Sequence, residues 1–364
     1  MKKICILYKI LRVALFTLLA SACGSSDPSG STAPQNNQHT NGNDHQTSEK
    51  GVEIDPKQAV LPELRPFVDQ EPTITFNSVT LRLARAKLAI DRPDVPESVA
   101  VKEIPGPGDA PNIKLYIADP DPARKNKPAF LHIHGGGYIV YRAQDMAPHA
   151  PGLAEECDCL VVSVDYRLAP ETKFPGPMED NFTALKWLYE NADTIGVDRT
   201  RIAIGGESAG GGHAAQLAIA ARDRGIPIVL QVLTYPMLDD RTGSTHAVPN
   251  HIGRYIWNAG SNKFAWTSYL GQPAGSDNPP YGAVPARVKD LSGLAPAWIG
   301  VGGSDLFLAE DLEYARRLTE AGVHAELLLV PGAFHAFDGI ASETSVAKRF
   351  HKSRVEALRR ALHL

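Results

Sequence analysis

The chain has 364 residues, 43% of them hydrophobic, which is enough to bury a large core in one unit or in two or three domains. Its formal net charge is −4 at pH 7, and no block of basic residues stands out, which argues against a nucleic acid as partner. Four cysteines are too few for a disulfide scaffold.

The first residues have the pattern of an export signal. Basic residues precede an apolar run at 13–20, which is too short to span a bilayer, and small residues follow it. Residues 1–22 are therefore expected to be a signal peptide. Two cleavages fit: ordinary removal after the A-x-A pattern that ends at Ala22, or lipobox processing, in which Cys23 becomes the lipid-modified first residue.

The segment that follows favours the lipoprotein interpretation. From 24 to 50 the only aliphatic side chain is Ala33, so the segment cannot bury enough apolar surface to offset its ordering entropy. We expect residues 23–52 to be a disordered tether with a reach of about 30 Å. The protein would then be anchored through Cys23 to the cell envelope, facing the periplasm. The alternative is a secreted or soluble periplasmic protein.

Residues 53–104 are expected to form a helical cap or flank, because leucines and valines recur at helical spacing in 63–70 and 78–90. From 105 to 364 strand and helix patterns alternate. Short apolar or period-two runs indicate strands at 112–118, 128–134, 159–166, 201–206, 228–236, 296–303 and 325–331. Helical spacing lies between them at 181–192, 214–225 and 308–322. The alternation predicts a mostly parallel sheet with helices on both faces.

One glycine-rich motif separates a predicted strand from a predicted helix. Gly206-Glu207-Ser208-Ala209-Gly210 has the G-x-S-x-G pattern, which in this context holds a serine on a sharp turn that lifts its hydroxyl out of the sheet. Small neighbours are needed because strand and helix pass close behind the turn. A phosphate-binding loop would need a Gly-Lys-Ser/Thr or a G-x-G-x-x-G sequence, and neither is present. Ser208 is the predicted nucleophile.

A serine hydroxyl needs a base, and the base needs an orienting acid. Asp305 follows the strand at 296–303, and His335 follows the last predicted strand. The carboxyl ends of parallel strands share one edge of a sheet, so both residues should lie near Ser208. Each also has an ordinary interpretation, as a helix cap and as a surface loop residue. Asp338 and Asp311 remain weaker candidates for the acid.

Acyl transfer also needs donors for an oxyanion. The segment 132–138, HIHGGGY, follows a predicted strand, and its glycines let backbone N–H groups approach a tetrahedral oxygen; another donor is the N–H of Ala209. His132 and His134 lie two apart, but no third ligand has a suitable spacing for zinc. We expect no metal, and we expect His134 to brace the glycine loop that starts at Gly135.

Four segments together resemble the hormone-sensitive-lipase family, the HGGG group of α/β-hydrolases. They are HGGGY at 134–138, VVSVDYRLAPE at 161–171, FPGPMEDNFTALKWL at 174–188 and GGESAGG at 205–211, and the match runs from about residue 60 to the end. The resemblance implies an α/β-hydrolase fold with a helical cap, to which the segment at about 245–285 contributes. It implies a serine carboxylesterase that needs no cofactor, with these site residues: nucleophile Ser208, acid Asp305, base His335, and oxyanion donors Gly136, Gly137 and Ala209.

Three residues depart from the family pattern. Glu207 stands where Asp is common, Gly212 where Asn is frequent and Ala336 where Gly is usual. None removes a catalytic group, so the departures bear on positioning and on substrate preference.

Other side chains have expected structural roles. Asp165 and Arg167 are expected to form an ion pair, because a buried carboxylate needs a partner. Cys157 and Cys159 are expected to be buried thiols, since a bridge across that spacing would be strained. Three aromatic residues are candidates for an acyl pocket: Tyr138, Trp257 and Phe264.

The sequence therefore predicts hydrolysis of carboxylic esters with short to medium acyl chains. A lactonase or a sugar- or drug-ester deacetylase would use the same machinery. The third hypothesis is a non-catalytic small-molecule binder, because the gibberellin receptors resemble this family and have lost the catalytic histidine. The presence of His335 in this chain argues against it. The sequence leaves the oligomeric state open.

Overall fold

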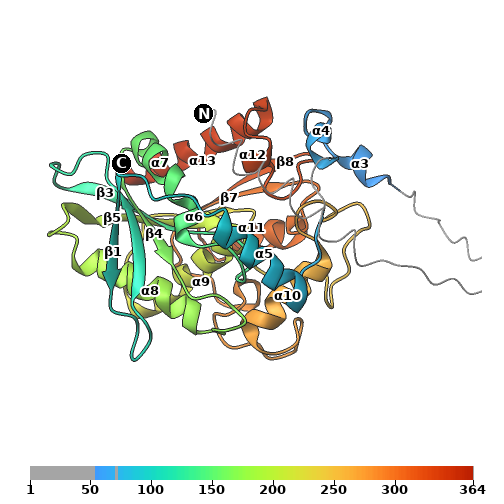
Figure 1. Cartoon of the computed structure of the whole chain (residues 1–364), viewed down its shortest axis with the longest axis horizontal. Helices are drawn as coiled ribbons and strands as arrows, with labels where there is room; N and C mark the ends of the chain where they lie inside the picture. Colours follow the sequence, from blue (N-terminus) through green and yellow to red (C-terminus); the bar gives the residue numbers. More distant parts are fainter. Residues whose placement is uncertain (1–53, 70–72, 364) are drawn as a thin grey trace, which may run out of the picture.

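The computed structural model describes residues 54–69 and 73–363, and this part of the chain is built around one mixed sheet (Figure 1). The predicted signal peptide, the tether and Cys23 lie outside the described residues. The strands are β1 Val99–Ile104, β2 Ile113–Ala118, β3 Lys127–Ile133, β4 Leu160–Asp165, β5 Val197–Glu207, β6 Gln231–Thr234, β7 Ala297–Gly302 and β8 Ala325–Val330.

The strand order is β1-β2-β4-β3-β5-β6-β7-β8. The pairs β1–β2 and β2–β4 are antiparallel, and every other neighbouring pair is parallel. The expected mostly parallel sheet is thus confirmed. The expected end of the flank at residue 104 is wrong, because 99–104 form the first strand. As an edge strand, β1 buries only its two end residues, Val99 and Ile104, so it carries no alternating pattern.

Helices cover both faces of the sheet, and two apolar clusters hold them there. One cluster joins the sheet to α8, α9 and α11, and the other joins it to α7 and α13; Figure 1 shows α7 and α13 above the sheet and α8 and α9 below it. The α-helices are α3 Pro56–Ala59, α4 Arg65–Val68, α5 Ser78–Ile90, α6 Ala143–Met146, α7 Ala150–Cys157, α8 Gly176–Glu190, α9 Ala209–Arg224, α10 Ala259–Leu270, α11 Leu308–Glu320, α12 Phe337–Ile340 and α13 Ser345–His363. Short 3₁₀ turns lie at Pro62–Leu64, Ala147–His149 and Pro285–Arg287.

The helix α9 shows why its sequence is so rich in glycine and alanine. It starts directly after Ser208, and every residue from Ala209 to Ala221 is buried. Small side chains let the helix axis approach the sheet closely, so the helix is enclosed almost all round rather than amphipathic. It ends at Gly225, whose left-handed backbone (φ 74°) caps the last turn.

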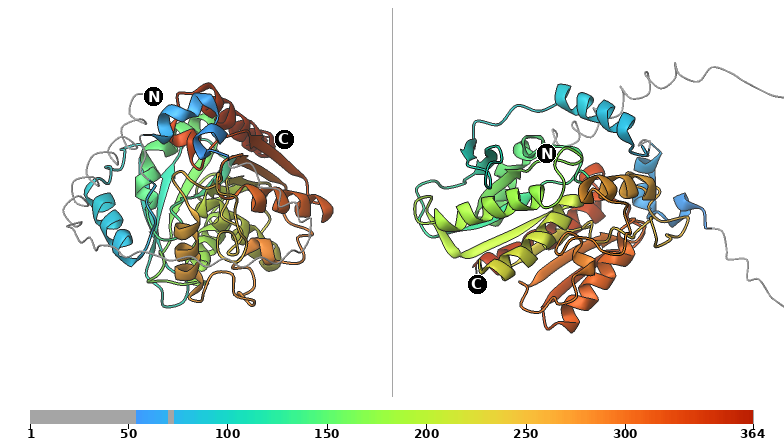
Figure 2. Two further views of the ribbon diagram at one scale, coloured as in Figure 1. Left: turned by 90° about the vertical axis from the view of Figure 1, so that its right-hand side faces the viewer. Right: turned by 90° about the horizontal axis from the view of Figure 1, so that it is seen from below.

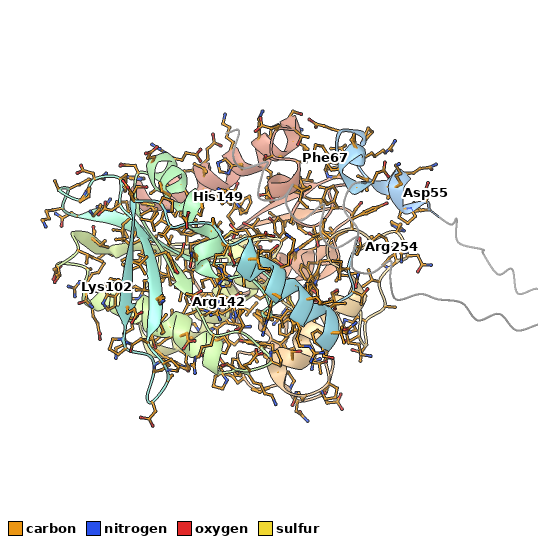
Figure 3. The ribbon with its side chains drawn as sticks, viewed as in Figure 1. Asp55, Phe67, Lys102, Arg142, His149 and Arg254 are labelled. Carbon is orange, nitrogen blue, oxygen red and sulfur yellow. The ribbon has the colours of Figure 1, made fainter. Side chains whose placement is uncertain are left out.

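The segment just before α5 is joined to the segment that contains α10, although the two are far apart in the sequence. Thr73 Oγ1 donates to the carbonyl oxygen of Arg254 (2.8 Å), and the N–H of Phe76 donates to Ser261 Oγ (2.9 Å). In Figure 2 α5 lies on the outside of the molecule, apart from the sheet. Figure 3 labels Arg254 on this loop, at the opposite end of the molecule from Lys102 on β1. Among the described residues, no helix is long and apolar enough to cross a membrane.

Candidate active site

The turn after β5 holds Ser208 in a strained backbone conformation. Its φ is 58° and its ψ is −122°, a region that residues other than glycine rarely adopt. Backbone hydrogen bonds to β6 and to the loop after it fix the turn. The Ser208 N–H donates to the carbonyl of Thr234 (2.9 Å), and the Ser208 carbonyl accepts from the N–H of Met237 (3.0 Å). The predicted strand-to-helix turn is therefore present.

The glycines beside Ser208 are required by close backbone packing. A Cβ on Gly206 would lie 2.1 Å from the carbonyl oxygen of Ile133, and one on Gly210 would lie 2.0 Å from the same atom. Real Cβ atoms do not come this close to a carbonyl. The two glycines thus let β3 and its following loop run directly behind the serine.

Ser208, His335 and Asp305 form a continuous hydrogen-bonded chain. His335 Nε2 lies 2.9 Å from Ser208 Oγ, and His335 Nδ1 lies 2.8 Å from Asp305 Oδ2. The other carboxylate oxygen of Asp305 accepts from the N–H of Phe307 (3.0 Å). With Nδ1–H donating to the carboxylate, Nε2 is free to accept the hydroxyl proton. The residues come from the carboxyl ends of β5, β7 and β8, the edge that the sequence predicts.

The two alternative acids do not reach the histidine. Asp338 accepts from the hydroxyl of Tyr235 (2.7 Å) and lies 3.6 Å from Arg354 Nη1. Asp311 is fully buried within α11, and neither of its carboxylate oxygens has a hydrogen-bond partner among the described residues. The hydrogen-bond geometry therefore favours Asp305 as the acid that orients His335.

Three backbone N–H groups in the predicted oxyanion segments are unpaired. Within residues 54–69 and 73–363, the N–H groups of Gly136, Gly137 and Ala209 have no protein acceptor. Gly136 and Gly137 adopt positive φ angles of 113° and 58°, which glycine permits at low cost. Unpaired N–H groups at the end of β3 and at the start of α9 are what an oxyanion hole requires.

The aromatic residues predicted to line a pocket take different positions. Trp257 packs against Gly137 and donates from Nε1 to Asn262 Oδ1 (3.2 Å). Tyr138 instead points into the interior: it is fully buried, donates to the carbonyl of Met237 (3.0 Å) and stacks on Tyr269. The expectation for Tyr138 is wrong, because its side chain is fully buried in the interior and lines no pocket.

The two histidines of the HIHGGG segment are engaged within the protein. His134 donates from Nδ1 to the carbonyl oxygen of Gly135 (2.8 Å) and stacks on Tyr166, so it braces the glycine loop. Burial lowers the pKa of His134 to about 3, which keeps the imidazole neutral at pH 7. His132 lies between Ser163 and Glu207. Among the described residues, no three His, Cys, Asp or Glu side chains are grouped so that they could hold a metal.

Glu207, one of the departures from the family pattern, is held by two basic side chains, His132 and Arg354. Its Oε2 lies 2.9 Å from His132 Nε2, and its Oε1 accepts from Arg354 Nη1 (3.3 Å). Burial by itself raises the pKa of Glu207, but His132 and Arg354 outweigh burial and lower it to about 2. The residue before the nucleophile is therefore an anion at neutral pH.

The other two departures have local explanations. A Cβ on Gly212 would lie 2.2 Å from the carbonyl oxygen of Met237 and 2.3 Å from the hydroxyl of Tyr138, so a larger residue has no room there. Ala336 has a left-handed backbone with φ 59°. Glycine adopts this conformation with less strain than alanine.

The expected ion pair between Asp165 and Arg167 is wrong. Arg167 reaches into α8 and binds Asp180 through Nε (2.8 Å) and Nη2 (2.7 Å), because the chain turns toward that helix as it leaves β4. Asp165 instead accepts from the N–H of Ala143 (3.0 Å) and lies 3.6 Å from Arg142 Nη1. The two cysteines are free and buried, as expected.

One residue close to the site was missed by the sequence reasoning. Arg354 lies on α13, a helix that the sequence reasoning did not predict, between the buried residues Phe350 and Leu358. A cation in the middle of an i, i+4, i+8 apolar stripe is a signal that could have identified it.

The chain is similar to known α/β-hydrolases and esterases. Residues 130–339 match a family described by the α/β-hydrolase fold. Carboxylesterase NlhH of Mycobacterium tuberculosis is 34% identical over 315 residues, which cover 83% of this chain and 96% of that protein. Ethyl acetate hydrolase of Pseudomonas putida is 32% identical over a match that covers 69% of this chain and 78% of that protein. The solved structure of a bacterial heroin esterase superimposes with a TM-score of 0.77 at 34% identity, covering 84% of this chain and 99% of that one.

Proposed function

Since the chain belongs to the α/β-hydrolase family, in its hormone-sensitive-lipase-like group of carboxylesterases, we propose that it hydrolyses carboxylic esters with Ser208, His335 and Asp305 as its catalytic triad. The observation that carries this assignment is the hydrogen-bonded chain, with 2.9 Å between Ser208 Oγ and His335 Nε2 and 2.8 Å between His335 Nδ1 and Asp305 Oδ2. The assignment of the ester bond rests on the esterase relatives.

In the first half-reaction an acyl-enzyme forms. His335 Nε2 takes the hydroxyl proton as Ser208 Oγ attacks the ester carbonyl, and Asp305 stabilises the resulting imidazolium. The carbonyl oxygen becomes an oxyanion that accepts from the N–H groups of Gly136, Gly137 and Ala209. The bond to the leaving oxygen then breaks, and His335 gives its proton to the departing alcohol.

In the second half-reaction water replaces the alcohol. His335 removes a proton from water, and the oxygen attacks the acyl carbon to form a second tetrahedral intermediate in the same oxyanion site. Collapse of that intermediate breaks the bond to Ser208 Oγ, which takes the proton back. One ester and one water thus become one acid and one alcohol, and no metal or organic cofactor takes part.

We propose short to medium acyl chains for the substrate. Only 8% of the surface of Ser208 and 4% of that of His335 is exposed, and the indole of Trp257 stands beside the oxyanion glycines. Such an enclosed site favours small acyl groups. The relative named as an ethyl acetate hydrolase supports the same choice.

Hydrolysis of p-nitrophenyl esters from acetate to palmitate tests the proposal, with the Ser208→Ala variant in parallel. We expect turnover that is highest for acetate to hexanoate and that is lost in Ser208→Ala. Lactones and acetylated sugars belong in the same panel, since a narrow lactonase or deacetylase would prefer them. No turnover on any of these esters by folded protein would contradict the proposal.

We also propose export and lipid attachment at Cys23, supported by the signal pattern at 1–22 and the polar tether that follows. Mass spectrometry of the mature N-terminus in a bacterial host tests it. Diacylglycerol on Cys23 is the expected result, and a mature chain that starts at an unmodified Cys23 would reject the anchor in favour of a soluble exported protein.

A further inference from the structure

We propose that Arg354 is a positioning residue that ties the turn of Ser208 to the loop of His335 through the carboxylates of Glu207 and Asp338. The inference deepens the proposed function and rests on it, because both carboxylates belong to segments that carry triad residues. Arg354 itself lies on α13, a helix that carries none of the three triad residues.

The geometry places one guanidinium between two anions. Arg354 Nη1 lies 3.3 Å from Glu207 Oε1 and 3.6 Å from Asp338 Oδ2. Glu207 immediately precedes the serine, and Asp338 follows His335 by three residues. The Arg354 side chain is only 17% exposed and the Asp338 side chain 9%, so solvent screens these interactions less than it would at the surface.

Each carboxylate has a second contact that leads toward the reacting groups. Glu207 also binds His132 of β3, which comes just before the oxyanion glycines. Asp338 also accepts from the hydroxyl of Tyr235 (2.7 Å), and the ring of Tyr235 packs edge-on against the imidazole of His335 at 4.8 Å. Both ends of the bridge therefore contact segments whose position decides the distance between Ser208 and His335.

The bridge is anchored from behind. Arg354 Nη2 contacts His351 Nδ1 (3.1 Å), and His351 Nε2 contacts Glu156 of α7 (2.6 Å). The neighbouring residues Phe350 and Leu358 are buried in the cluster that fixes α13 on the sheet. The guanidinium thus has a defined position before any substrate binds, which is the requirement for a group that positions others.

Loss of a purely structural ion pair would lower the stability of the fold without changing the rate of the reaction. The test therefore needs readouts of the reaction itself. The first compares kcat and KM in Arg354→Met, Arg354→Lys and the control Arg349→Met, which removes an exposed arginine of the same helix. We expect kcat to fall about 10- to 100-fold in Arg354→Met, as for an ångström-scale misplacement of reacting groups. KM should change less than about threefold. Lysine should restore part of kcat, and Arg349→Met should match wild type.

The second readout is the pH dependence of kcat/KM, which responds to charge around the base. Among the charged and titratable groups of this region, Asp305 and Tyr235 contact the imidazole of His335. Behind Tyr235 follow Asp338, Arg354, Glu207 and His132, each in contact with the one before, and Asp311 interacts electrostatically with Glu310 and with Asp305. Removal of the cation leaves Asp338 without its charged partner and Glu207 with His132 alone, and the added negative charge favours the protonated imidazole. The acid limb should shift to higher pH by on the order of half a unit in Arg354→Met. Glu207→Gln in that background should return it toward wild type.

A third measurement does not depend on the ester chosen. The rate constant for labelling of Ser208 by a fluorophosphonate reports the geometry of serine and base directly, and we expect it to fall at least about tenfold in Arg354→Met. Labelled wild type without ester turnover would show that the substrate is wrong while the bridge is still tested. Wild type that is neither labelled nor active would overturn the proposed function, and the bridge with it.

The proposal is overturned if folded Arg354→Met keeps wild-type kcat, acid limb and labelling rate and shows only a lower melting temperature. Should Arg354→Met fail to fold, Arg354→Lys and the Glu207→Gln/Arg354→Met double variant carry the same readouts. In that case a double variant with the acid limb of wild type and a lysine variant with reduced kcat are the expected results. A lysine variant that equals wild type in all three measurements would refute the need for a guanidinium spanning both carboxylates.

Discussion

The indole of Trp257 lies directly against Gly137: a Cβ on Gly137 would come within 2.2 Å of Trp257 Cη2. Gly137 carries one of the unpaired N–H groups of the proposed oxyanion hole, so the proposed mechanism places the indole next to the ester carbonyl. Phe76 contacts the same indole, with ring centroids 5.8 Å apart. Two segments distant in sequence thus form one wall of the site.

Replacement of Trp257 by alanine should widen the acyl range. The lost indole leaves room for several methylene groups beside the carbonyl, and each buried methylene contributes about 0.8 kcal/mol. We expect the ratio of kcat/KM for p-nitrophenyl octanoate over acetate to rise at least about tenfold. The measurement is the chain-length profile of both proteins, and an unchanged profile would show that acyl chains extend in another direction.

Replacement of Gly137 by alanine should damage the oxyanion site in two ways. The added methyl meets the indole, and φ 58° is strained for any residue with a Cβ. Loss of one donor typically costs about 10²–10³ in kcat. The double variant with Trp257→Ala removes the steric part only, so it should recover part of kcat. Full recovery would mean that the backbone strain has no effect, and no recovery that the clash has none.

Asp305→Asn should lower kcat by about 10⁴, because the amide cannot hold the useful tautomer of the imidazole. Asp338→Asn is the matched comparison, since Asp338 contacts Tyr235 and Arg354 instead of His335. We expect the kcat of Asp338→Asn to fall only about tenfold. Steady-state kinetics of both folded variants decide the assignment, and a larger loss in Asp338→Asn would reverse it.

Asp311→Asn should stabilise the protein, and more so at higher pH. Burial, with the nearby Glu310 and Asp305, raises the pKa of Asp311 well above its usual value. The folded state therefore binds this proton more tightly than the unfolded state, so wild type loses stability as pH rises above the unfolded pKa of about 4. Asparagine does not titrate. Urea unfolding should give a gain of about 2 kcal/mol at pH 8 that shrinks toward pH 4; a gain that grows toward acid would contradict the sign.

Gly210→Ala should destabilise the fold, because its Cβ would lie 2.0 Å from the carbonyl oxygen of Ile133. The forced shift of packed backbone costs about 1–3 kcal/mol or more. The control is Gly152→Ala in α7, where a Cβ meets no atom within 4 Å, and helix propensity predicts a small gain. Thermal melts of both variants make the comparison. Equal melting temperatures would show that the turn relaxes around the methyl group.

Local patterns in the sequence were sufficient for the strands β2 to β8 and for the turn that carries Ser208. Strand and helix periodicity, and glycines around one serine, depend on neighbours a few residues away, so they can be read from the chain itself. The shared edge of Ser208, Asp305 and His335 follows from the parallel sheet. The roles of these residues remain a prediction until the variants are measured.

Only the tertiary structure decided which polar groups pair. Arg167 binds Asp180 rather than Asp165, and Arg354 meets Glu207 across 147 residues of sequence. The edge strand 99–104 has too little buried surface to show a pattern of its own. Partners of this kind are selected by how helices pack on the sheet, and a side chain many residues away leaves no periodic mark on the segment it will contact. Sequence therefore determined the local conformation around the serine, whereas packing determined the charges that surround it.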